Sequence, residues 1–193
     1  MTLTDRSVRE LLDAFAASTP TPGGGSAAAL AGAVGASLLA MVARLPSSPA
    51  ASDADRARLE DAGARCAALK DALIGFVDAD SAAYDMVASA YRLSKDTADE
   101  KAARSAAIQD GLRQAIAVPL DVMRACAEAI AHAQVVAELG NAPARTDVEV
   151  GLELLRAGLR GARLNVEVNL ESVKDASYVQ RVRDQIERYD PRN

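Results

Sequence analysis

The sequence has no tryptophan and few other aromatic residues, with two phenylalanines and four tyrosines among 193 residues. Strands of β-sandwiches and barrels favour aromatic and β-branched residues, so this shortage disfavours an all-β fold. It also disfavours a stacking surface for single-stranded nucleic acid. Alanine, the strongest helix former, supplies 43 residues, whereas glycine supplies only 12. The composition therefore predicts an all-α protein with a single domain over 1–193.

Basic residues, histidine and cysteine are also scarce. Lysine and arginine total 22 against 27 acidic residues, which gives a net charge of −5. No basic block is present, so binding to duplex nucleic acid is not expected. One histidine and two cysteines, Cys66 and Cys126, are too few for a standard zinc site. Residues 1–10 lack a basic-then-apolar secretory pattern, so we expect reduced thiols, no metal site and a cytoplasmic protein.

Apolar residues recur at helical spacing along most of the chain and predict a bundle of five to six helices. The expected ranges are about 5–17, 27–45, 53–93, 97–140, 146–173 and 176–189. The one long helix, over about 53–93, would extend about 60 Å. That length exceeds what a compact monomer of this size needs and favours a homo-oligomer. Pro119 lies inside the next expected helix, over about 97–140, and is expected to kink or divide it.

One segment approaches the composition of a membrane span. Residues 27–43 carry no charged side chain, and this length reaches the lower limit for crossing a bilayer. Most of these residues are alanine, glycine or serine. A buried central helix, whose small residues let neighbouring helices approach closely, is therefore favoured, and no membrane partner is expected.

Asp80 is the residue that fits a plain helical bundle least. It lies on the apolar stripe of the long helix, where a carboxyl group must be paired, protonated or functional. Burial would raise its pKa and suit it to proton transfer near neutral pH. Tyr84 shares its helical face and either contacts a ligand or packs. The alternative for Asp80 is an acid at the bundle edge or one paired with arginine.

Three further features allow both a functional and a structural interpretation. The segment 20–26 opens a helix with Ser26 as the expected N-cap, and its bare N–H groups either bind an anion or simply form a turn. Asn165 and Asn169 share one helical face, where they either bind a heterocycle or hydrogen-bond between helices. Lys95 lies at a helix break, where it faces either a cleft or solvent.

Taken together, these residues resemble the formiminotransferase-cyclodeaminase family in its C-terminal, cyclodeaminase-like domain. The likeness extends from about residue 5 to about residue 175. The matching segments are 20–33, 80–84, 93–95, 97–104, 118–120, 140–141, 146–147 and 165–170. The most specific combination is the glycine motif that continues into an alanine-rich helix, together with the distant Asn-Val-x-x-Asn-Leu at 165–170.

The resemblance implies an all-α homodimer that acts on a one-carbon derivative of tetrahydrofolate and uses no cofactor. Stand-alone bacterial members resemble methenyltetrahydrofolate cyclohydrolases, hydrolases that add water to the 5,10-methenyl bridge and yield 10-formyltetrahydrofolate. Related domains are cyclodeaminases, which release ammonia from 5-formiminotetrahydrofolate. A dimer of the same fold that is catalytically altered or inactive, or that binds a different ligand, is a further alternative.

The resemblance also implies roles for particular residues. Asp80 is the candidate catalytic base, and Lys95 is expected to orient water or carry a proton to the departing nitrogen. The candidate substrate-binding residues are Pro22, Gly23, Gly24, Gly25, Ser26, Tyr84, Asn141, Asp147, Asn165 and Asn169.

Two departures from the family's pattern favour the altered-ligand alternative. Family members often carry a lysine-rich stretch after the second helix, whereas residues 44–53 contain no lysine. Pro143 stands where the Gly-Asn-x-Asn motif usually has its second asparagine. The first departure argues against a binding site for a polyglutamate tail in residues 44–53. The second predicts that one substrate-facing amide is missing.

Overall fold

Helices make up nearly all of this computed structural model, which describes residues 2–46 and 52–189. The elements are α1 (Val8–Phe15), α2 (Gly24–Arg44), α3 (Asp53–Tyr91), α4 (Ala98–Leu139), η1 (Ala142–Ala144), α5 (Arg145–Leu170) and α6 (Ala176–Arg188). The described residues form no β-strand. The predicted all-α fold of five to six helices is therefore confirmed for this part of the chain, which has six α-helices.

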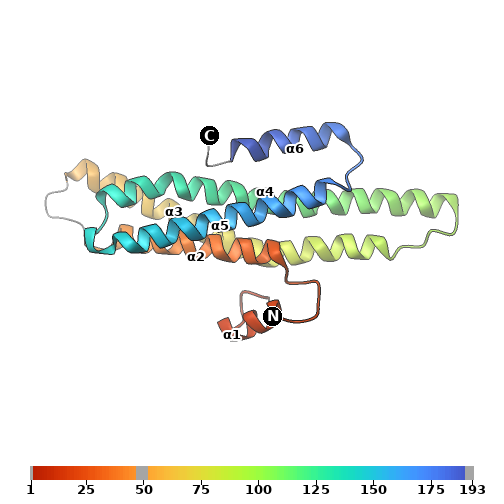
Figure 1. Ribbon diagram of the computed structural model, residues 1–193, viewed down its shortest axis with the longest axis horizontal. Coiled ribbons are helices and arrows are strands. Elements are labelled where there is room, and N and C mark those ends of the chain that lie inside the picture. The colour runs from red at the N-terminus through yellow and green to blue at the C-terminus, as the bar shows by residue number, and fades with distance from the viewer. Residues whose placement is uncertain (1, 47–51, 190–193) are drawn as a thin grey trace.

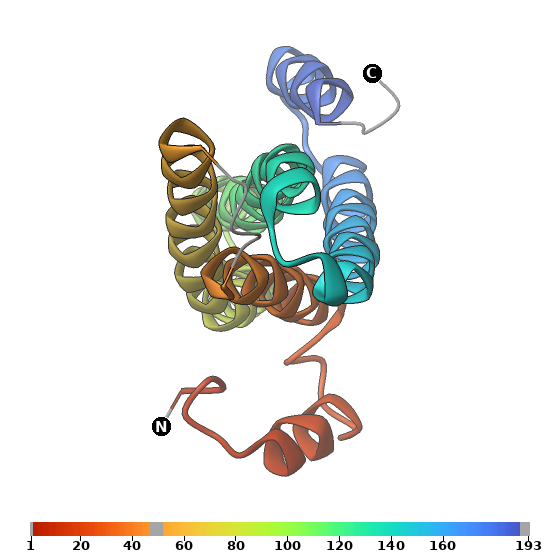
Figure 2. The same ribbon diagram turned by 90° about the vertical axis from the view of Figure 1, so that its left-hand side faces the viewer.

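Helices α2 to α5 pack side by side and form the core, as the end-on view in Figure 2 shows. Helix α2 contacts α3, α4 and α5, and most of its buried residues are alanine or glycine. By length and composition alone this helix could cross a membrane, but 56% of its most apolar stretch is buried in the bundle. Its packing is that of the predicted central helix.

Helices α2 and α5 approach closely where small residues face each other. A Cβ atom on Gly35 would lie 2.6 Å from the carbonyl oxygen of Gly151, and one on Gly158 would lie 2.8 Å from that of Ala28. A Cβ atom on any residue normally keeps a larger distance, so the backbones would have to separate. Glycine at these positions therefore sets the spacing of the two helices.

Two helices, rather than the predicted one, are unusually long. Helix α3 has 39 residues and α4 has 42, and both project beyond α2 and α5 as a two-helix hairpin (Figure 1). Helix α4 continues through Pro119, which lacks the N–H group that would bond to the carbonyl of Ala115. The side-chain amide of Asn169 donates to that carbonyl instead, at 2.9 Å. This bond replaces the missing backbone donor, and the proline does not divide the helix.

Helices α1 and α6 flank the core on opposite sides (Figure 2). The segment before α1 is tied to α3, because Asp78 accepts hydrogen bonds from the Leu3 N–H at 2.6 Å and the Thr4 hydroxyl at 2.8 Å. Helix α6 buries Val182 and Ile186. The segment before α1 is thus attached to the middle of α3. The site described next lies where this part of α3 meets the start of α2.

Candidate active site

The first turn of α2 lies against the middle of α3, and Ser26 is at the contact. Its side chain is fully buried, and its hydroxyl oxygen lies 2.9 Å from the carbonyl oxygen of Val77. The same oxygen lies 3.0 Å from Oδ2 of Asp80 and 3.2 Å from the hydroxyl of Ser81. The prediction that Ser26 caps the helix is wrong. Helix α2 begins at Gly24, two residues before Ser26, and the Ser26 hydroxyl bonds to α3 instead.

The glycine motif determines which side chains can lie beside this turn. A Cβ atom on Gly25 would overlap Oδ1 of Asp80, so only glycine lets the carboxyl group occupy its position. A Cβ atom on Gly24 would lie 3.5 Å from Nδ2 of Asn165, which is ordinary contact distance. The motif, which begins at the buried Pro22, therefore brings a carboxyl group of α3 and an amide of α5 to one turn of α2.

The environment of Asp80 favours its neutral form. Burial raises the pKa of Asp80 above its ordinary value of 3.8, and hydrogen bonds from Ser26 lower it in part. No basic group of the described chain contributes to this shift. The interpretation of Asp80 as an acid paired with arginine therefore finds no support in residues 2–46 and 52–189.

Both protonation states of Asp80 can be hydrogen-bonded at this position. An ionised carboxylate accepts the hydroxyl proton of Ser26. A protonated carboxyl group donates to that hydroxyl oxygen, and the Ser26 proton then goes to the carbonyl of Val77. The cluster can gain or lose a proton without leaving a buried polar group unpaired, which suits a general acid or base.

Tyr84 lies near this cluster on α3, and Asn165 and Asn169 lie on α5, with Asn165 beside Gly24. Tyr84 is one helical turn beyond Asp80 and is 44% exposed. Asn165 donates to the carbonyl of Gly161 within its own helix, at 2.9 Å. Asn169 makes the interhelical bond to α4 described above. One amide donor of each asparagine is thus bonded to the protein, and the interhelical alternative is confirmed for Asn169.

Lys95 does not lie beside Asp80. About eleven residues of α3 separate Asp80 from Tyr91, which corresponds to about 16 Å, and Lys95 lies beyond the end of that helix. Lys95 lines a hollow at the free end of the α3–α4 hairpin. Within one chain, the two candidate catalytic residues are therefore held apart by a continuous helix.

Asn141 and Asp147 lie at the opposite end of the bundle from this hairpin. The Asn141 side chain donates to the carbonyl of Pro46 at 2.8 Å, just past the end of α2 and about 30 Å along that helix from Ser26. Asp147 lies in the first turn of α5, and Pro143 lies in η1. Residues 47–51, part of the lysine-free stretch, lie outside the described residues.

Sequence reasoning missed Ser81, whose hydroxyl joins the Asp80 cluster. The available signal was its position directly after Asp80, but only the packing of α2 shows that the Ser81 hydroxyl meets Ser26. Sequence reasoning also did not anticipate that Lys95 would lie together with other basic side chains.

Comparisons with known proteins identify relatives of this chain by sequence and by fold. The family model described as formiminotransferase-cyclodeaminase matches residues 7–188. The chain is 40% identical over 176 residues to a methenyltetrahydrofolate cyclohydrolase of Methylorubrum extorquens. This alignment covers 91% of the present chain and 85% of that protein. It is 33% identical over 184 residues to a formimidoyltransferase-cyclodeaminase of Rattus norvegicus, which covers 95% of this chain but only 34% of that longer protein.

A solved structure has the same fold. The crystal structure of formiminotetrahydrofolate cyclodeaminase from Thermotoga maritima matches with a TM-score of 0.84, over 95% of this chain and 88% of that one. At 24% identity, this likeness shows the fold alone. The family model, in contrast, matches nearly the whole sequence. The chain therefore belongs to the formiminotransferase-cyclodeaminase family.

Proposed function

We propose that this protein is a methenyltetrahydrofolate cyclohydrolase, which converts 5,10-methenyltetrahydrofolate and water to 10-formyltetrahydrofolate. The observation that carries the proposal is the partly buried Asp80, whose pKa is raised and whose carboxyl group can be hydrogen-bonded to Ser26 in either protonation state. The similarity to a cyclohydrolase over most of both chains favours this reaction over deamination. The rat cyclodeaminase relative is, by contrast, a much longer protein.

The reaction needs a positioned water and a group that accepts its proton, because the methenyl carbon is already a cation shared between N5 and N10. Asp80 takes one proton as the water oxygen bonds to that carbon. The resulting tetrahedral carbon carries a hydroxyl group and both nitrogens. Its bond to N5 then breaks, N5 takes up a proton and the hydroxyl loses one, so one proton is released overall.

The turn around Gly24 and Gly25 supplies the surface on which the substrate lies. The side-chain amide of Asn165 lies beside Gly24, and the exposed ring of Tyr84 lies one helical turn beyond Asp80; both side chains are proposed to contact the pterin ring. The proposal includes no metal ion and no cofactor, since water is the second substrate. Asn141 and Asp147 lie too far along the bundle to contact the same pterin ring within one chain.

The catalytic role of Lys95 requires a second copy of the protein, because α3 keeps this residue away from Asp80 of its own chain. The projecting hairpin supports such a homodimer. Its apolar side chains Met86, Tyr91 and Leu93 are each about half exposed, and a mostly apolar hollow of about 710 Å³ lies on the same hairpin. Burial of these side chains against a second copy would stabilise the dimer.

The direct test follows the near-ultraviolet absorbance of 5,10-methenyltetrahydrofolate with purified protein. We expect hydrolysis above the buffer rate and a loss of at least about 100-fold in kcat for Asp80→Asn. Asp61→Asn, an exposed acid on the same helix that lies outside the hairpin hollow, is the matched control and should retain activity. A near-normal rate for Asp80→Asn would refute the role of this residue. An inactive wild type that releases ammonia from 5-formiminotetrahydrofolate would favour the cyclodeaminase alternative.

A further inference from the structure

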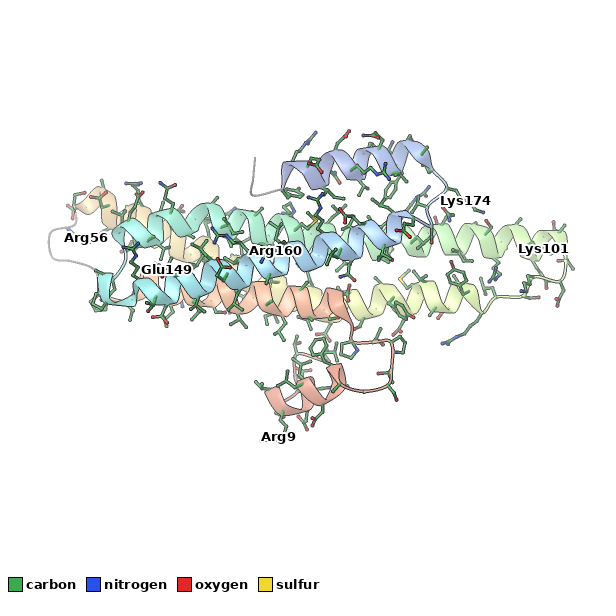
Figure 3. The ribbon with its side chains drawn as sticks, in the orientation of Figure 1. Arg9, Arg56, Lys101, Glu149, Arg160 and Lys174 are labelled. Atoms are coloured by element: carbon green, nitrogen blue, oxygen red, sulfur yellow. The ribbon has the colours of Figure 1, made fainter. Side chains whose placement is uncertain are left out.

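A second hollow, of about 440 Å³, lies at the free end of the α3–α4 hairpin. The end of α3, the start of α4 and the loop between α5 and α6 surround it. Four of its lining residues are basic, namely Lys95, Lys101, Arg104 and Lys174, and none is acidic. Figure 3 places the labelled Lys101 and Lys174 toward this same end of the molecule.

This gathering of positive charge contrasts with the rest of the chain. The net charge is −5, and three of the four lysines in the sequence line this one hollow. The remaining lysine, Lys70, forms an ion pair with Asp71. Within the described residues, none of the four basic groups of the hollow forms an ion pair. The nearby carboxylate of Glu100 instead accepts hydrogen bonds from the backbone at the start of α4.

Neighbouring groups hold two of these cations in position. The guanidinium of Arg104 donates to the carbonyl of Tyr91 from Nε at 3.3 Å and from Nη2 at 3.0 Å. It also lies 5.5 Å from the centre of the Tyr91 ring. The ammonium group of Lys174 donates to the hydroxyl of Ser105 at 2.9 Å. These bonds leave further N–H donors on both groups.

Gln109 of α4 fixes the loop that carries Lys174. Its side-chain amide donates to the carbonyl of Ser172 at 3.1 Å and accepts the backbone N–H of Lys174 at 2.8 Å. The loop between α5 and α6 is thus attached to the hairpin by two hydrogen bonds. Cations that are already positioned lose less conformational entropy when a ligand binds.

We propose that this hollow binds a compact anion with two or more carboxylate or phosphate groups. Four basic groups without acidic partners repel one another, and a multivalent anion would offset this repulsion while accepting their N–H donors. Such an anion is either a separate small molecule or the acidic end of the substrate itself. The proposal depends on the hollow and not on the catalytic function proposed above.

Inorganic pyrophosphate is a suitable probe, with binding measured by titration calorimetry on the full chain at low ionic strength. We expect one saturable site per chain whose affinity falls as salt is added. The double variant Lys101→Gln, Lys174→Gln should weaken binding about tenfold or more. Lys70→Gln removes the same kind of charge outside the hollow and should bind as the wild type does. Absent saturable binding, or equal weakening by Lys70→Gln, would overturn the proposal.

Folate turnover then distinguishes the two sources of the anion. If the hollow holds the acidic end of the substrate, pyrophosphate competes with the substrate, and the double variant raises KM with little change in kcat. If it holds a separate anion, KM stays unchanged in the double variant although pyrophosphate binding is weakened. Either result supports the anion site. Because pyrophosphate binding is measured without turnover, it remains informative even if the proposed catalytic function fails.

Discussion

The bond between Asn169 and the proline-containing turn of α4 has an energetic consequence that can be measured. Pro119 leaves the Ala115 carbonyl without its usual backbone donor, and Asn169 donates to that carbonyl at 2.9 Å. Replacement of Asn169 by alanine removes this donor in the part-buried space between α4 and α5. The carbonyl of Ala115 is then left with poor access to water.

The size of the effect follows from the cost of an unpaired buried carbonyl group, which is about 1–3 kcal/mol. We expect Asn169→Ala to lower the free energy of unfolding by about 2 kcal/mol. A Pro119→Ala substitution restores an N–H group at position 119, which can bond to the Ala115 carbonyl within the helix. In that background Asn169→Ala should cost less than about 1 kcal/mol, which gives a coupling energy of about 1 kcal/mol or more.

The four proteins of this double-mutant cycle are compared by urea denaturation, followed by helical circular dichroism and analysed with their m-values. Asn165→Ala is the matched control, because its amide bonds to a carbonyl of its own helix that also has a backbone partner. It should cost less than Asn169→Ala and cost the same in both backgrounds. If the Pro119 and Asn169 effects were additive, the amide would not replace the missing donor.

Three further predictions concern the pH dependence, the core and the subunit arrangement. Because burial raises the pKa of Asp80 above 3.8, ionisation opposes folding. Stability should therefore decrease as pH rises through that pKa, activity should increase over the same range, and Ser26→Ala should move the activity profile to higher pH. In denaturation experiments, Gly35→Ala should destabilise by about 1–3 kcal/mol because its Cβ would meet the α5 backbone. Gly75→Ala, with no neighbour within 4 Å, should stabilise by up to about 1 kcal/mol. Mixed Asp80→Asn and Lys95→Gln proteins should regain about a quarter of wild-type activity if a dimer shares its sites between subunits. An inactive mixture of properly exchanged subunits would place the function of Lys95 elsewhere.

The sequence by itself determined the helical class and most helix positions, because both depend on neighbours three or four residues apart. The third helix was predicted over about 53–93 and runs from Asp53 to Tyr91. The fourth helix was predicted over about 97–140 and runs from Ala98 to Leu139, with Thr97 and Glu100 forming reciprocal capping hydrogen bonds at its start. The sequence also identified Asp80 as an acid on an apolar stripe, and the structure buries it in part.

Contacts between segments far apart in the chain were decided only by the tertiary structure. Pro119 does not divide α4, because a donor 50 residues later, on Asn169, replaces the missing N–H group. Ser26 does not cap its helix, because its hydroxyl finds partners on α3. Lys95 lies apart from Asp80, because an uninterrupted helix carries it away. Local propensity determines most helix positions, whereas the choice of partner depends on how whole helices pack against one another.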